Sequence, residues 1–304
     1  MIVSITGGLG NQLFQMYAGL CFEKEKIDLS TDFGNPRMSN GLPDLFHFAL
    51  PSRIGIIESK KQSRISEKIG GFAISRNFMQ HPVDRFFLSH TALTTTMNVY
   101  LSIRLKKKIN HFSSPAVGFV DVNSRDHNLV FGYFQSYRYF NSLDSKDKEL
   151  TLRQETEKFA QLKDMAGKSG PIVVHVRLGD YLKEKHFGIL TTDFYARAFS
   201  RLNINSSSQP IWVFSDDPRK AIEILPIQYR NRYFLVPNHG LNPAETLELM
   251  RYGSSYVIAN STFSWWGANL SYTKNPAVVA PEKWFAGMQD PKDLIPGHWM
   301  TEKR

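Results

Sequence analysis

The chain has 304 residues, of which 42% are hydrophobic and 21% are charged, as in a globular protein with room for two domains. Its single cysteine excludes a disulfide framework and a cysteine-rich zinc site, and no apolar run is long enough for a membrane-spanning helix. The net charge of +9 predicts an anionic partner, which on composition alone is a nucleic acid, an anionic lipid or a phosphorylated substrate.

The first predicted unit is a strand, a glycine turn and a helix. Ile2, Val3 and Ile5 indicate a short β-branched strand, glycines follow within residues 7–10, and apolar side chains then recur at helical spacing from Leu13 to Cys21. Glycines let the backbone approach a ligand, and the start of a helix offers N–H donors to a phosphate or a hydroxyl. Asn11 and Gln12 add two amides that suit hydroxyl groups. A tight turn without a ligand is the alternative.

The two halves of the chain differ in regularity. Residues 30–124 show no clean periodicity, and we expect irregular helices and long loops there. In the C-terminal half, continuous apolar strands alternate with helical segments, which predicts a parallel α/β sheet that is buried on both faces. The predicted strands are Ile172–Val176, Ile211–Phe214, Tyr233–Val236, Tyr256–Ala259 and Ala277–Ala280, and the predicted helices are 193–202, 218–225, 243–252 and 265–272.

The stretch 162–170 ends in Gly167, Lys168, Ser169 and Gly170 and is typical of a linker. We therefore expect two domains, 1–160 and 161–304, which would face each other across a cleft. Ligands of parallel sheets bind beyond the carboxyl ends of the strands, so the polar residues that follow each strand are the candidates for a site.

His175, Arg177 and Asp180 follow the first strand of the C-terminal half. Arginine offers a planar fork to phosphate oxygens, and histidine can hydrogen-bond a ribose or a base. An Arg177–Asp180 salt bridge that braces the turn is the alternative.

Residues 260–268 (NSTFSWWGA) join another strand to a helix. The N–H groups at the start of that helix can hold a diphosphate, and helix capping by the small hydroxyl residues is the alternative. Trp265 and Trp266 either wall a cleft or pack in the core.

Two acidic segments have the same ambiguity. Asp216 and Asp217 precede a proline and are typical of a helix cap, although one of them can also reach a ribose or base. Asn242 and Glu245 have the spacing of a capping box. The histidines are scattered and the acidic residues form no metal-binding cluster, so we expect no metal ion. A diphosphate would then be neutralised by arginine and helix N-termini.

Four segments together resemble the α-1,2-fucosyltransferases of glycosyltransferase family 11, in particular bacterial members that build O-antigen or related surface glycans. They lie in the family's order and span almost the whole chain: Gly7–Gln15 (GGLGNQLFQ), His175–Tyr181 (HVRLGDY), Phe214–Asp217 (FSDD) and Ile258–Ala268 (IANSTFSWWGA).

The resemblance implies a GT-B-like fold of two Rossmann-type domains with the active site between them. It implies inverting, metal-independent transfer of L-fucose from GDP-β-L-fucose to the 2-hydroxyl of a terminal galactose, with an acceptor glycan that can be lipid-linked. No cofactor is expected, since GDP-fucose is a co-substrate. The N-terminal domain would take the acceptor and the C-terminal domain the donor.

On this chain, the resemblance implies that Arg177 binds the diphosphate. It also implies that Arg177, Asn11 and Asp180 are the catalytic candidates. The general base stays open between a carboxylate such as Asp180 or Glu245 and the β-phosphate of GDP itself. The residues that would bind GDP-fucose are Gly8, Gly10, Gln12, His175, Asp216, Glu245, Ser261, Thr262, Phe263, Ser264 and Trp265.

The chain departs from the family pattern at two positions. Leu178 stands where the family usually has a second arginine, so Arg177 is the expected phosphate ligand. Thr246 stands where the family often has an acid, which leaves the role of its neighbour Glu245 open.

Two other classes of function remain as alternatives: a glycosyltransferase that uses another sugar nucleotide, and a non-catalytic α/β protein that binds glycans or nucleic acid. Lys and Arg are dispersed and no nucleic-acid motif is present, so we expect no nucleic-acid partner. The opening MIVSITGG becomes polar too early for a signal peptide, and we expect a cytoplasmic protein. The basic run Arg104–Lys108 predicts weak contact with the anionic inner face of the plasma membrane.

Overall fold

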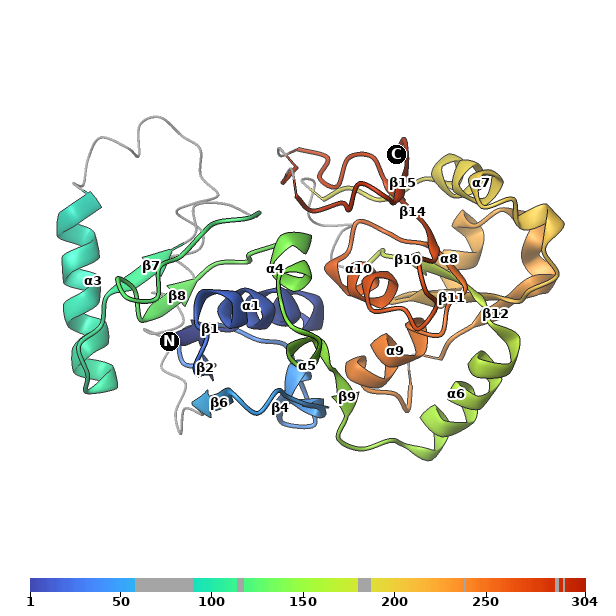
Figure 1. Ribbon diagram of the computed structural model, residues 1–304. Coiled ribbons are helices and arrows are strands. Elements are labelled where there is room, and N and C mark those ends of the chain that lie inside the picture. The colour runs from blue at the N-terminus through green and yellow to red at the C-terminus, as the bar shows by residue number, and fades with distance from the viewer. Residues whose placement is uncertain (58–89, 114–117, 180–186, 238, 288–289, 292) are drawn as a thin grey trace. The chain divides into compact units, whose positions relative to one another are not determined.

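The computed structural model describes residues 1–57, 90–113, 118–179, 187–237, 239–287, 290–291 and 293–304 (Figure 1). Contacts divide the chain into two compact units. Unit 1 comprises 1–38, 49–151 and 291–294, and unit 2 comprises 39–48, 152–290 and 295–304. The main division therefore falls at residues 151–152, ahead of the expected boundary at 160, and each unit borrows a short segment from the other half of the sequence.

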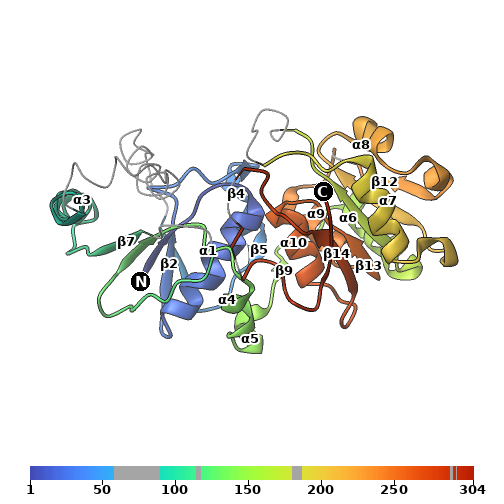
Figure 2. The ribbon, with the colours of Figure 1, turned by 90° about the horizontal axis from the view of Figure 1, so that it is seen from above.

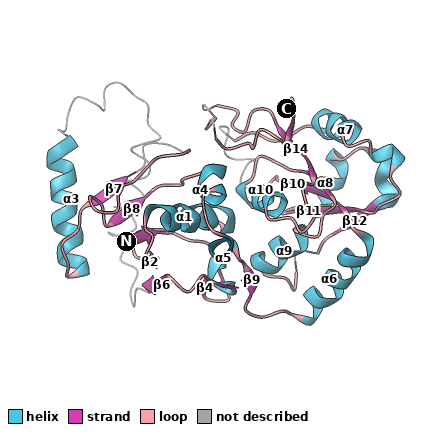
Figure 3. Cartoon of the chain, viewed as in Figure 1, coloured by secondary structure: helices cyan, strands magenta, loops and turns pink. Residues whose placement is uncertain are grey.

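Unit 1 is a parallel sheet with helices (Figure 3). Its strand order is β6-β2-β1-β8-β7, and every neighbouring pair is parallel. The strands are β1 (Ile2–Ser4), β2 (Ile27–Ser30), β6 (Ile54–Ile57), β7 (His111–Ser113) and β8 (Leu129–Phe131), and the helices are α1 (Leu9–Phe22), α3 (His90–Leu105), α4 (Tyr137–Asn141) and α5 (Ser145–Lys148).

The predicted strand, turn and helix at the N-terminus are confirmed as β1, the glycine turn and α1. The expectation of irregular structure over residues 30–124 is wrong for β6 and β7, which belong to the same sheet. These strands have four and three residues, which is too short for a periodic pattern to show.

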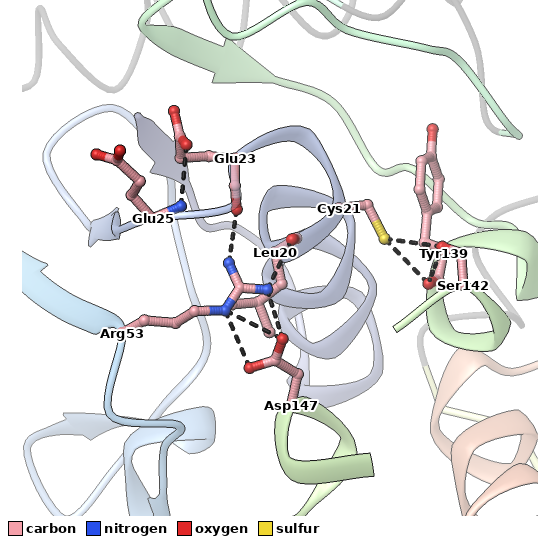
Figure 4. A network of polar contacts seen from close by, with 8 residues as sticks. All are labelled: Leu20, Cys21, Glu23, Glu25, Arg53, Tyr139, Ser142 and Asp147. Atoms are coloured by element: carbon pink, nitrogen blue, oxygen red, sulfur yellow. Dashed lines mark hydrogen bonds and ion pairs between the residues drawn. The ribbon is translucent and has the colours of Figure 1, made fainter. Parts of the chain in front are cut away.

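Arg53 fixes the C-terminal end of α1 (Figure 4). Its guanidinium donates hydrogen bonds of 2.8 and 2.6 Å to the carbonyl oxygens of Leu20 and Glu23, and it pairs with the Asp147 carboxylate of α5 at 2.6 Å. A cation at this end of a helix also complements the helix dipole. The hydrogen bonds from Arg53 hold the pKa of Asp147 below its usual range. The glycine turn precedes the N-terminal end of α1, so it is attached to a helix whose C-terminal end is fixed by Arg53.

Short elements occupy the segments where the chain passes between the units. They are β3 (Met38–Ser39), β4 (Leu42–Pro43), the 3₁₀ helix η1 (Asp44–His47), β5 (Phe48–Ala49) and β9 (Thr151–Leu152), and they form the pairs β3-β4 and β5-β9.

Unit 2 is a six-stranded parallel sheet of order β12-β11-β10-β13-β14-β15. Its strands are β10 (Ile172–Val176), β11 (Ile211–Ser215), β12 (Tyr233–Leu235), β13 (Ser255–Val257), β14 (Ala277–Pro281) and β15 (Met300–Glu302). Its helices are α6 (Glu157–Ser169), α7 (Thr192–Arg201), α8 (Pro218–Ile224), α9 (Pro243–Met250) and α10 (Thr262–Asn269), with 3₁₀ turns η4 (Ile204–Ser206) and η5 (Ile227–Arg232). The predicted α/β class with parallel sheets is confirmed in both units.

Helices cover both faces of the unit 2 sheet. All five residues of β10 are buried, as the continuous apolar pattern predicted. Val174 and Val176 pack with α7 and α8 in one apolar cluster. His175 points to the opposite face, where it contacts α10, and α9 packs against α10. Seen from above, α7 and α10 lie on opposite sides of the strands (Figure 2).

The predicted linker over residues 162–170 is wrong, because it forms the second half of α6. Phe159, Leu162 and Ala166 recur at helical spacing and are buried, and this pattern outweighs the helix-breaking tendency of Gly167. Gly170 has a left-handed φ of 52° and ends the helix.

No helix in the part of the chain that the structure describes is long and apolar enough to cross a membrane. The basic run 104–108 lies at the end of α3, with exposed lysines at 106, 107 and 108. Its contact with anionic lipid stays a prediction.

Asp147→Asn is expected to lower the free energy of unfolding by about 1–3 kcal/mol at pH 7, because it weakens the charge-assisted contacts to Arg53. Since the folded-state pKa of Asp147 is lowered, its stabilisation is complete above the ordinary aspartate pKa of about 4 and is lost as the pH falls through the lower folded-state value. Urea unfolding between pH 3 and 8 measures the difference.

The matched control is Asp164→Asn, which removes an exposed i,i+4 partner of Lys168. We expect it to cost less than about 1 kcal/mol. Equal losses in the two variants would contradict the anchoring role of Arg53.

Candidate functional site

The carboxyl ends of β10 and β13 mark the point where the strand order of unit 2 reverses. From β10 the chain winds outward to β11 and β12, then crosses to β13 on the other side of β10. Open α/β sheets bind ligands at such a switch point. The His175, Arg177 and Ser261–Ser264 candidates all lie at this edge.

His175 of β10 contacts the first turn of α10, the helix that follows β13. Its Nδ1 lies 2.9 Å from the Ser264 hydroxyl, and the Ser264 hydroxyl also lies 3.2 Å from the carbonyl oxygen of Ser261. The arrangement that satisfies both contacts has Ser264 donating to the carbonyl and Nδ1–H donating to Ser264, which leaves Nε2 as an acceptor. Burial, and secondarily the Arg177 charge, lower the pKa of His175 to about 3. The ring is therefore neutral at physiological pH.

Arg177 is held by Asp216. Its Nη1 lies 3.3 Å from an oxygen of Asp216, and the other oxygen of Asp216 accepts a 2.9 Å hydrogen bond from the N–H of Leu178. A Cβ on Gly179 would come within 2.4 Å of the Asp216 carboxylate, so glycine leaves room for this contact. The Arg177–Asp180 salt bridge is untested, because Asp180 lies outside the described residues. Arg177 does have an acidic partner, but it comes from the end of β11.

Leu178 is 2% exposed and belongs to the apolar cluster beneath α7 and α8. At the position where the family usually has a second arginine, this chain therefore places a core side chain. The adjacent Asp217, and not Asp216, caps α8 by accepting from the N–H of Lys220.

The first turn of α10 has no side-chain cap. Ser261 occupies the cap position, yet its hydroxyl accepts no hydrogen bond from the helix. By contrast, the caps of α6, α7, α8 and α9 all accept one. The capping alternative therefore fails at Ser261, and the role of Thr262, Phe263 and Ser264 as backbone donors stays a prediction. Trp265 was wrongly included, since its N–H already donates to the carbonyl of Ser261 at 3.0 Å.

Trp265 and Trp266 pack in the core. Both are 0% exposed, and their rings meet edge to face with centroids 4.7 Å apart. Asn260 is buried as well, and its amide donates to the carbonyl oxygens of Phe187 and Trp284. These buried residues support the loops at this edge of the sheet. The interpretation of the tryptophans as cleft walls is therefore wrong.

Glu245 has a structural role in unit 2. It is fully buried, and its two oxygens accept hydrogen bonds from the backbone N–H groups of Asn242 and Thr156. The predicted capping box is confirmed, because the Asn242 side chain in turn accepts from the N–H of Glu245. Both carboxylate oxygens are thus engaged by backbone donors, which argues against contact with guanosine or with a proton of the acceptor.

The glycine turn of unit 1 presents Gly8 and Asn11. Among the described residues, no atom lies within 4 Å of the place a Gly8 Cβ would take, whereas Gly10 is buried in the first turn of α1. Gly8 occupies the cap position of α1 and offers no side chain to cap it. Asn11 is partly exposed. Gly8 and Asn11 are therefore parts of the turn that lie at the surface.

Gln12, predicted to bind the donor, instead braces the turn. It is 0% exposed, and its amide nitrogen donates to the carbonyl oxygens of Gly7 and Arg37 at 2.8 and 3.2 Å. Gly7 also exchanges backbone hydrogen bonds with Asn35 and Arg37. The loop that follows β2 therefore runs alongside the glycine turn and fixes its shape.

Sequence reasoning missed Gln135, which follows β8. It is 7% exposed, and its Nε2 donates to the Asn11 Oδ1 at 3.0 Å. The signal was present, since Gln135 comes soon after the apolar run Leu129–Phe131, but a strand of three residues is too short to be found by its pattern.

Within the described residues, no group of three or more His, Cys, Asp or Glu side chains could hold a metal ion. Metal independence itself stays a prediction.

Comparisons with known proteins agree with the sequence motifs. A family model described as "Glycosyl transferase family 11" matches residues 76–299. The O-antigen biosynthesis glycosyltransferase WbnK of Escherichia coli is 33% identical over 185 residues, which cover 57% of this chain and 60% of WbnK. An alpha-1,2-colitosyltransferase of Escherichia coli is 26% identical over 300 residues, which cover 94% of this chain and 92% of that protein. The chain thus spans less than two thirds of the length of WbnK.

Two solved structures have a similar chain course at low identity. The fucosyltransferase NodZ from Bradyrhizobium matches with a TM-score of 0.44 and 10% identity, covering 89% of this chain and 92% of that chain. The E. coli ADP-heptose LPS heptosyltransferase II matches with a TM-score of 0.48 and 12% identity, covering 99% and 89%.

The imidazole of His175 is expected to stay neutral from pH 8 down to pH 5, because its pKa is lowered to about 3 by burial. NMR of histidine-labelled protein measures this through the ring carbon shifts, with a His175→Asn variant to assign the signal. A titration midpoint of His175 between pH 5 and 8 would contradict the buried, Ser264-bonded ring.

Proposed function

The chain belongs to glycosyl transferase family 11, and from this we propose that it transfers L-fucose from GDP-β-L-fucose to the 2-hydroxyl of a terminal galactose, with inversion and without a metal ion. That the protein is a glycosyltransferase follows from the family. The donor, the acceptor and the stereochemistry are our proposal.

The observation that carries the proposal is the arrangement of Arg177, Asp216 and His175 at the switch point of unit 2. Asp216 fixes the guanidinium at the end of a fully buried strand, where a planar fork suits the oxygens of a diphosphate. Asp216 acts here as a positioning residue for Arg177. Because Leu178 packs in the core, Arg177 is the arginine of this motif that a diphosphate can use.

The start of α10 supports the same ligand. The N-cap residue Ser261 makes no side-chain hydrogen bond to the helix, and the helix dipole adds partial positive charge there. In our proposal, Thr262, Phe263 and Ser264 give backbone N–H groups to the diphosphate, and His175 Nε2 accepts from a hydroxyl or amino group of the guanosine. A neutral ring is the state required for that contact.

Transfer breaks the bond between the fucose anomeric carbon and the β-phosphate oxygen, and its electron pair leaves with GDP. The acceptor 2-hydroxyl oxygen forms the new bond on the opposite face of the sugar and loses its proton. Charge that develops on the diphosphate is stabilised by Arg177 and the start of α10, which are in place before the reaction. Since both oxygens of Glu245 are engaged by backbone N–H groups, the proton goes to Asp180 or to the β-phosphate.

The relatives suggest both the pathway and a competing donor. By their names, one acts in O-antigen synthesis and the other transfers colitose through an α-1,2 linkage. We therefore propose a surface-glycan acceptor for this chain, and we take GDP-colitose, whose sugar is 3-deoxy-L-fucose, as the second candidate donor. The colitosyltransferase matches over 94% of this chain, which is the reason to test it.

Arg177→Ala is expected to lower activity at least 100-fold and to remove the thermal stabilisation that GDP gives the wild type, because the diphosphate loses its cationic ligand. The measurement is a thermal shift with GDP, UDP, ADP and DNA, together with the rate of transfer. The wild type should respond to GDP alone.

Arg177→Lys is the companion variant, since it keeps the charge and removes the fork, and we expect an intermediate loss. Arg219→Ala, an exposed arginine on α8, is the matched control and should retain the GDP shift. Near wild-type turnover in Arg177→Ala would overturn the proposal.

The sugar and the linkage found in the product identify the donor and the hydroxyl group that is modified. Incubation with GDP-fucose and a panel of galactosides, followed by linkage analysis, should give α-1,2-fucosylated galactose. Faster transfer from GDP-colitose would reassign the donor, and transfer to a hydroxyl other than the 2-hydroxyl would reassign the linkage. No transfer from either donor, with no thermal response to GDP, would contradict the proposed function.

A further inference from the structure

Gln135 of unit 1 has a buried amide oxygen that lacks a donor. The residue is 7% exposed, and its Nε2 is used by Asn11, but among the described residues no group donates a hydrogen bond to its Oε1. Leaving a buried acceptor without a partner is unfavourable and rare in native proteins, so this oxygen calls for an explanation.

The backbone around Gln135 holds the side chain at some cost. Phe134 has a left-handed φ of 49°, which is unfavourable for an aromatic residue, and its ring is locked by edge-to-face contacts with Phe22 and Tyr139. On the other side, Ser136 caps α4. The backbone of Gln135 is thus fixed between a strained residue and a capped helix, and its side chain is held by burial and by the hydrogen bond to Asn11.

Gln135 stands at the switch point of the unit 1 sheet. β1 lies in the middle, β2 pairs with one of its edges and β8 with the other. Gln135 follows β8 and reaches Asn11 in the first turn of α1, which follows β1. The hydrogen bond between them therefore bridges the two strands where a parallel sheet binds its ligand, beside the open position at Gly8.

A second buried glutamine nearby shows what a purely structural role looks like. Gln15 accepts from the N–H of Thr6 at 2.9 Å and donates to the carbonyl oxygen of Gly132 at 3.0 Å. Both ends of its amide are satisfied within unit 1. In the part of the chain that the structure describes, Gln135 has only one end of its amide satisfied.

We propose that Gln135 is an acceptor-binding residue, whose Oε1 accepts a hydrogen bond from a hydroxyl group of the sugar that receives the transferred residue. This inference rests on the proposed function for the identity of the reaction. A neutral amide pair suits an uncharged sugar hydroxyl, whereas the charged ligand, the diphosphate, has its arginine on unit 2.

The test compares Gln135→Met with Gln15→Met. For Gln135→Met we expect kcat/KM for the acceptor to fall about 10- to 100-fold, with the donor KM and the GDP thermal shift unchanged. Its Tm should be unchanged or higher, because an unsatisfied polar atom is removed. Gln15→Met should lower the Tm, since it leaves buried backbone groups without partners.

Acceptors that each lack one hydroxyl make the assignment specific. In the wild type, the acceptor that lacks the Gln135-bound hydroxyl should lose about the same factor as the variant loses with the complete acceptor. Gln135→Met should show no further loss with that one analogue, while the other analogues lose as much in the variant as in the wild type.

Two results would overturn the inference. One is that every acceptor analogue lowers kcat/KM by the same factor in Gln135→Met as in the wild type. The other is a fall in Tm for Gln135→Met as large as that for Gln15→Met, which would make Gln135 structural whatever the donor is. Absence of any transfer by the wild type would instead count against the proposed function, and the Tm comparison would still decide the role of Gln135.

Discussion

The burial of β10 on both faces is the constraint from which the unit 2 site follows. A strand covered by helices on each side can carry polar side chains only where they find partners or where the strand ends. His175 meets the first condition through Ser264, and Arg177 meets the second through Asp216 at the end of the neighbouring strand. The two neighbours of β10 therefore set the orientation of the two polar groups that unit 2 offers to a ligand.

The same requirement separates bracing residues from residues that face a ligand. Gln12, Glu245 and Asn260 are buried polar side chains with backbone partners, and each fixes a turn or a loop beside a sheet edge. All three lie in or near the family motifs, so a residue type and its position in a motif do not reveal whether it binds a substrate or holds the loop that does. The hydrogen-bond partners of each side chain show which of these two roles it has.

The sequence predicted the α/β class, the five principal strands of unit 2 and the strand, turn and helix at the N-terminus, because long apolar runs and helical spacing are strong patterns. It failed for β6 and β7, which are too short to show a pattern, and for α6, where glycines concealed a buried helical face. In the site, Arg177 and His175 were placed correctly at the edge of the sheet. The pairing of Arg177 with Asp216 was not predicted, because the approach of Asp216 to residues 177–179 is a tertiary contact between two strand ends.

The positive charge of the chain and the local chemistry of the site act at different ranges. Arg177 and Asp216 form a pair with no net charge, so this pair attracts an anionic ligand only weakly from a distance. The excess of +9 supplies a long-range field that attracts anionic ligands such as the proposed nucleotide sugar, and salt should weaken that effect. Asp216 fixes the guanidinium in advance, so the proposed transfer would need little reorganisation when charge develops on the leaving group. A single arginine oriented in this way can bind a diphosphate, although the position of the family's second arginine is filled here by the buried Leu178.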